Sequence, residues 1–154
     1  MQSKPTDELN SILENAKPSD IDEYLRENKQ YMAGEKKSFY FFFKDTLDDK
    51  GIKLKDVYSF AGVSESYGGR IIRQEGHARD RDLIIRLCIA GHFNLQEINS
   101  ALKIYGLTEL YPKDPRDVVI IVAINNRIYD LSLIDDMLSE RGLDPITSEV
   151  TEEK

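Results

Sequence analysis

Residue types that commonly carry chemistry are scarce in this chain of 154 residues. Cys88 is the only cysteine, which excludes an intrachain disulfide and a cysteine-based zinc site, and we expect it in the core. The two histidines, His77 and His92, do not lie in a metal-binding spacing such as HExxH. The sequence also lacks a glycine-rich phosphate loop and a nucleophile motif. We therefore expect no metal, no cofactor and no enzymatic activity.

Long apolar runs are missing as well. The longest, VVIIVAI at 118–124, has seven residues, whereas a membrane helix needs roughly 20. Residues 1–10 lack the basic-then-apolar pattern of a signal peptide. These absences predict a cytoplasmic protein without a membrane segment. Apolar residues still make up 40% of the chain, which is enough to build a folded core.

Positive charge is scarce overall, since the net charge is −7, but it is unevenly spread. Residues 35–91 carry 11 basic and 9 acidic side chains, whereas residues 1–34 and 92–154 have net charges of −3 and −6. Contacts to phosphates usually dominate affinity for DNA. Only the middle third therefore has a charge that favours DNA, and the acidic flanks would oppose binding unless they point away.

Apolar residues at helical spacing, with capping residues and glycine stops, predict an all-α protein. The expected helices cover residues 6–16, 18–32, 39–50, 54–61, 65–74, 80–90, 95–105, 115–124 and 132–140. The run at 118–124 also has the β-branched composition of a strand. Asp114 and Pro115 are typical of a helix start, and no other segment offers a pairing strand, so we expect a helix there.

Five consecutive aromatic residues, Phe39 to Phe43, begin the third expected helix. One face of a helix takes only about half of them, so the others need cover. We expect the N-terminal helices to supply it.

Residues 54–74 have the form of a helix-turn-helix. Gly62 suits the tight turn because glycine accepts a positive φ without steric cost. Ser64 is a natural N-cap for the second helix. Val57 and Ile71 fall where such a motif buries apolar groups. The second helix of this motif can lie in the major groove of DNA.

Two sets of residues are candidates for contact with DNA. On the groove-facing side of the second helix they are Ser64, Glu65, Ser66, Gly69, Arg70 and Arg73. The candidate phosphate contacts are Lys53, Lys55, Arg79 and Arg81. Arginine can bond guanine O6 and N7 bidentately, and serine can bond bases or phosphates. Glutamate accepts only from a cytosine amino group and otherwise repels phosphate. For each basic residue, the alternative is a solvated side chain or an ion pair with a neighbouring carboxylate.

Residues 38–91 resemble the lambda-repressor/Cro-like helix-turn-helix domain, the Xre family of bacterial and phage regulators. The residues that carry the resemblance are Val57, Gly62-Val63-Ser64, Ile71, and the helix from Arg81-Asp82-Leu83 to Ala90-Gly91. The stretches SESYGGRI, RDRDLIIRLCIAGHFNLQEINSAL and LYPKDPRD also resemble a subset of Xre-like proteins from anaerobic Firmicutes with additional N- and C-terminal helices. The resemblance implies five packed helices and dimeric binding to operators.

The chain departs from this family's pattern at two places. The fifth position of the motif is usually alanine, and here it is Tyr58. The middle of the recognition helix usually carries a buried β-branched or leucine side chain, and here Gly68 is followed by Gly69. Two adjacent glycines inside a helix cost roughly 1–2 kcal/mol relative to alanine. One hypothesis links the departures: Tyr58 occupies the space that Gly68 leaves.

These observations predict four parts, which are an N-terminal helical extension at 1–36, the helix-turn-helix domain at 37–107, a C-terminal helical pair at 108–146 and an acidic tail at 147–154. The first functional hypothesis is a sequence-specific transcriptional regulator that binds double-stranded DNA as a homodimer through the C-terminal helices. The alternative keeps the fold but loses the DNA role, giving an adaptor that binds a protein partner through acidic and aromatic surfaces.

Overall fold

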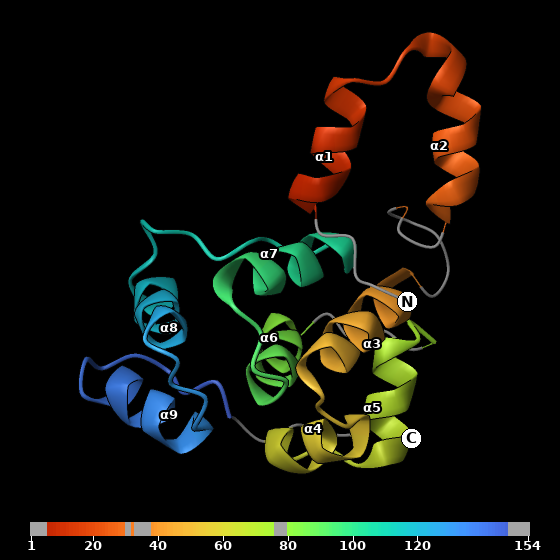
Figure 1. Ribbon diagram of the computed structural model, residues 1–154. Helices are drawn as coiled ribbons and strands as arrows, with labels where there is room; N and C mark the ends of the chain where they lie inside the picture. The colour runs from red at the N-terminus through yellow and green to blue at the C-terminus, as the bar shows by residue number, and fades with distance from the viewer. Residues whose placement is uncertain (1–5, 30–31, 33–37, 76–79, 148–154) are drawn as a thin grey trace.

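The computed structural model describes residues 6–29, 32, 38–75 and 80–147. These residues form α-helices and one short 3-10 helix, without any strand among them, so the all-α prediction is confirmed (Figure 1). The elements are α1 (Thr6–Glu14), η1 (Pro18–Asp20), α2 (Ile21–Glu27), α3 (Ser38–Lys50), α4 (Leu54–Ala61), α5 (Glu65–Ile72), α6 (Arg81–Ala90), α7 (Leu95–Ile104), α8 (Pro115–Asn125) and α9 (Leu131–Ser139).

Capping residues begin several helices where the sequence predicts. The Asn94 side chain accepts the N–H of Glu97, whose carboxylate accepts the N–H of Asn94, which makes a capping box at α7. Asp114 accepts two N–H groups at the start of α8, with Pro115 in the first turn. The apolar run at 118–124 is therefore helical rather than extended.

Some predicted boundaries are wrong at the ends of the chain. The second expected helix does not reach residue 32, because α2 ends at Glu27. There the Asn28 side chain donates a hydrogen bond to the carbonyl of Tyr24 at 3.0 Å, an alternative to continued helix. α1 ends at Glu14, two residues early. α9 begins at Leu131, one residue earlier than expected, because Asp130 caps it.

Helix α6 lies at the centre of the core. All eight residues from Leu83 to Ala90 are buried, including Cys88 as expected, and α6 packs against α4, α7 and α9. A helix that is buried on all sides fixes the positions of its neighbours. Around it, α3 packs against α5 and α7, and α5 packs against α3 and α4. Helix α8 packs against α7 and α9 (Figure 1).

The inward rings of the aromatic run in α3 pack against later parts of the chain. Phe39 and Phe43 are fully buried. The ring of Phe39 meets Tyr105 edge-on at 4.8 Å between centroids, and that of Phe43 lies 5.0 Å from Phe93, so residues on either side of α7 tie α3 to the core. Tyr40 and Phe41 are half-buried, and cover of these outward rings by the N-terminal helices stays a prediction.

Two crossed ion pairs join the start of α6 to the start of α8. Arg81 binds both carboxylate oxygens of Asp117 at 2.9 and 2.8 Å, and Arg116 binds both oxygens of Asp82 at 2.7 and 2.8 Å. Burial alone would raise the pKa of Asp117, but hydrogen bonds from Arg81 and from the N–H of Tyr111 outweigh it and lower this pKa. These bidentate pairs are charge-assisted and fix the C-terminal pair against the domain.

Candidate nucleic-acid interface

The turn between α4 and α5 has the geometry that its sequence predicts. Gly62 has a φ of 75°, in the left-handed region, and the N–H of Val63 donates to the carbonyl of Tyr58 at 3.0 Å. The Ser64 hydroxyl accepts the N–H of Tyr67 at 3.1 Å and caps α5. The two helices therefore meet through a short, fully bonded turn.

Tyr58 and Gly68 fill one space between α4 and α5. Tyr58 is only 5% exposed, and its burial raises its pKa to about 12. A Cβ atom on residue 68 would lie 2.4 Å from Cδ1 of Tyr58 and 2.5 Å from Cε1, closer than carbon atoms approach. The contact supports the hypothesis that the two departures from the family pattern compensate each other.

Two side chains from later in the chain, the buried Arg86 and the half-buried Tyr105, hold α4 and α5 in place. Arg86, on α6, donates to the carbonyl of Ala61 at 3.0 Å, at the C-terminal end of α4. The hydroxyl of Tyr105 donates to the carbonyl of Ile71 at 2.9 Å, near the end of α5. Sequence reasoning did not identify these roles. An arginine inside the apolar stretch LIIRLCIA was the one available signal for Arg86.

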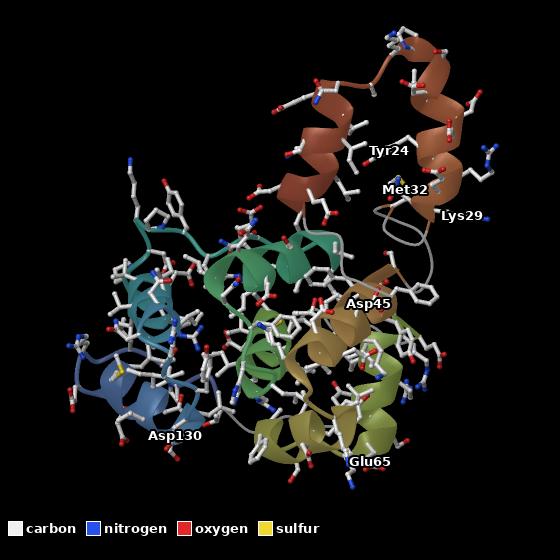
Figure 2. The ribbon with its side chains drawn as sticks, viewed as in Figure 1. Tyr24, Lys29, Met32, Asp45, Glu65 and Asp130 are labelled. Carbon is white, nitrogen blue, oxygen red and sulfur yellow. The ribbon has the colours of Figure 1, made fainter. Side chains whose placement is uncertain are left out.

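The start of α5 faces solvent. Ser64, Glu65 and Ser66 are exposed, and Figure 2 shows Glu65 where α5 begins beside α4. Ile71 and Ile72, in its last turn, are buried. The three predicted residues are therefore accessible together at the N-terminal end of this helix.

The two predicted arginines of this helix lie farther along it and are partly buried. Arg70 is in the last turn of α5, and Arg73 follows it at the C-cap. Nε of Arg73 donates to the Glu75 carboxylate at 2.9 Å, and both side chains are about two-fifths exposed. Such an exposed pair contributes about 0–1 kcal/mol, so a stronger partner would displace it readily.

Gly69 does not form part of the outer surface as expected. It is buried, because the guanidinium of Arg73 lies over it. A Cβ atom on residue 69 would lie 2.9 Å from Nη1 of Arg73. The exposed group at this position is therefore the arginine rather than the glycine.

The four candidate phosphate contacts fall into different places. Lys53 and Lys55 are exposed at the start of α4. Arg79 lies outside the described residues. Arg81 donates to the carbonyls of Thr108 and Glu109 as well as to Asp117, so the structure places it in the ion pair to α8 rather than on the interface.

No group of three or more histidine, cysteine, aspartate or glutamate side chains that could hold a metal ion gathers within the described residues. None of their helices is long and apolar enough to cross a membrane. Comparison with known proteins found no matching family model, curated protein or solved structure.

Proposed function

We propose that this protein is a sequence-specific, DNA-binding transcriptional regulator of the lambda-repressor-like type, which reads DNA through α5. The observation that carries the proposal is the solvent-facing start of α5, with Ser64, Glu65 and Ser66 together on a helix held by a short turn. The N-terminal residues of a recognition helix are the ones that reach base edges in the major groove.

The surrounding side chains suit this arrangement. Lys53 and Lys55 lie exposed at the start of α4, the helix that crosses the phosphate backbone in such motifs. When DNA binds, Arg73 leaves the Glu75 carboxylate and bonds a guanine edge. The loss of the ion pair costs little free energy because the pair is exposed. Glu65 favours a site with cytosine at the corresponding position.

We propose that a homodimer forms through α8. Of its seven-residue apolar run, Val119, Ile120, Ala123 and Ile124 are buried within the chain. Val118 and Val122, one turn apart, are 39% and 47% exposed and form a stripe for a second copy. A two-fold dimer of this type presents its recognition helices about 34 Å apart.

Selection of bound sites from a random duplex pool tests the regulator directly. Enriched sequences with two-fold symmetry are the expected result. With random duplex, the affinity should fall steeply with salt, and Lys55→Ala should flatten the logarithmic salt slope by about 1. Lys113→Ala, at an exposed position before α8, removes the same charge and should leave the slope unchanged. Absence of binding at about 50 mM salt would refute DNA binding.

A second candidate function, a protein adaptor, is favoured by the N-terminal hairpin of α1 and α2 (Figure 1). Residues 6–29 carry seven acidic and three basic side chains. Large apolar side chains nevertheless lie in solvent there: Ile12, Leu13, Ile21 and Leu25 are 41–55% exposed. Tyr24 points toward α1 (Figure 2) and lines a groove with Ile12 and Glu23. This surface suits a basic amphipathic helix of a partner.

One comparison separates the two functions. A regulator binds duplex DNA at about 50 mM salt, and Leu25→Ser leaves that binding unchanged. An adaptor fails to bind DNA but binds a helical leucine–lysine peptide, which Leu25→Ser weakens. Leu133→Ser provides the matched loss of an exposed leucine elsewhere, at 46% exposure against 47% for Leu25.

A further inference from the structure

A second surface feature lies where the end of α4 meets the start of α9. It is a groove of about 480 Å³, within the usual size range of small-molecule sites. Its described lining residues are Phe60, Ala90, His92, Tyr129, Asp130, Leu131 and Ser132. They come from three segments of the chain that the DNA interface does not use.

Aromatic rings dominate this groove. Phe60 is 69% exposed, the highest value among the large apolar side chains described. The rings of His92 and Tyr129 are stacked, with 4.3 Å between centroids and 7° between planes. His92 has a φ of 60°, an uncommon conformation for a residue other than glycine. This stacked pair and Phe60 line the same groove.

The charge in the groove is negative. Asp130 is the one carboxylate among the described lining residues. Its Oδ1 accepts the N–H groups of Ser132 and Leu133 and caps α9. A bare helix start would attract an anion, but here the carboxylate already occupies it. Figure 2 shows Asp130 at the end of α9 that lies nearest α4.

We propose that this groove binds a small organic cation, namely a quaternary or N-methylated amine that carries an apolar or aromatic group. The faces of Phe60 and Tyr129 attract the cation through their ring quadrupoles, and Asp130 supplies the opposite charge. The apolar part of the ligand covers the exposed Phe60 ring. A neutral or anionic ligand gains only part of these interactions.

Occupation of the groove would join α4, the first helix of the helix-turn-helix, to α9 of the C-terminal pair. The binding itself does not depend on whether the protein binds DNA, so the two proposals fail independently.

Titration of the full-length protein with benzyltrimethylammonium, followed by calorimetry and by NMR shifts, tests the site. We expect saturable 1:1 binding at roughly millimolar affinity, as befits a ligand of this size in an open groove. Phe60→Ala should raise Kd about two- to fivefold, the range of an exposed cation–π contact. Asp130→Asn, which keeps a good helix cap, should raise it about fivefold.

Matched controls make the result specific. Asp136→Asn removes the same charge from an exposed position on α9, and Tyr111→Ala removes an exposed ring elsewhere, so neither should change Kd. Benzyl alcohol, a neutral aromatic probe, should bind more weakly. The proposal is overturned if binding does not saturate, if Asp130→Asn and Asp136→Asn behave alike, or if the shifted resonances lie outside the groove. If Asp130→Asn disturbs α9, the exposed Phe60→Ala decides.

Discussion

Replacing Gly68 with alanine should destabilise this protein, although alanine is the better helix former. The added Cβ atom would lie 2.4 and 2.5 Å from two ring carbons of Tyr58. That ring is 5% exposed and packed between α4 and α5, so it cannot swing into solvent. The helices must therefore separate or the ring must leave its preferred rotamer.

The magnitude follows from two opposing effects. Overpacking of a well-filled core costs about 1–3 kcal/mol. The gain in helix propensity from glycine to alanine is about 0.8–1 kcal/mol. The net loss in free energy of unfolding should be about 1 kcal/mol, which lowers Tm by about 2–4 °C in a chain of this size.

The neighbouring glycine provides the control. A Cβ atom on residue 69 meets only the far end of the flexible Arg73 side chain, at 2.9 Å. Gly69→Ala should therefore stabilise the protein by about 0.5–1 kcal/mol, the usual propensity gain. Urea unfolding followed by far-UV circular dichroism measures both variants under the same conditions.

A double-mutant cycle isolates the contact. Tyr58→Ala alone should cost about 3–5 kcal/mol because it leaves a cavity. In that background Gly68→Ala should become stabilising, so the coupling energy between the two positions should be about 2 kcal/mol. The reasoning is refuted if Gly68→Ala stabilises the protein that retains Tyr58, as Gly69→Ala does.

Three further predictions concern the ion pairs, the dimer and the DNA surface. Asp117→Asn should cost about 3 kcal/mol in urea unfolding, because it leaves Arg81 without its carboxylate. Since the folded pKa of Asp117 is lowered, the stability that its carboxylate provides is present above the unfolded value of about 3.9 and is lost as pH falls. The free energy of unfolding of this variant should therefore decrease less steeply with falling pH than that of the unsubstituted protein. Val122→Ser should weaken self-association about 30-fold, measured by sedimentation, because about 1 kcal/mol of apolar burial is lost in each copy. An unchanged dimer dissociation constant would place the dimer contact elsewhere. Glu65→Gln should tighten binding to random duplex about twofold by anisotropy, and weaker binding would count against a phosphate near α5.

Local chemistry explains which parts of the fold were predictable. Ser64, Asn94 and Asp114 each bond an N–H within three residues, so their roles depend only on nearby sequence. Gly62 likewise acts within its own turn. These signals placed helices α4, α5 and α8 and the turn at Gly62 correctly.

Contacts between distant residues explain what was missed. Nearby basic residues in the sequence suggest that Arg81 contacts phosphate. Its carboxylate partner Asp117, however, lies 36 residues away in the sequence, so no local pattern shows the ion pair. Arg86 holds the carbonyl of Ala61, 25 residues earlier, and no local pattern pairs them. The groove around Phe60 depends in the same way on residues at the start of α9, which lie far later in the chain.

The crossed pairs between α6 and α8 also set an order of events during synthesis. Arg81 and Asp82 emerge from the ribosome 36 and 34 residues before the partners that neutralise them. Until α8 follows, the first turn of the central helix carries two unmatched charges beside the buried Leu83. Domains usually fold as their N-terminal parts appear. We therefore expect the first turn of α6 to reach its final packing only after α8 has been synthesised.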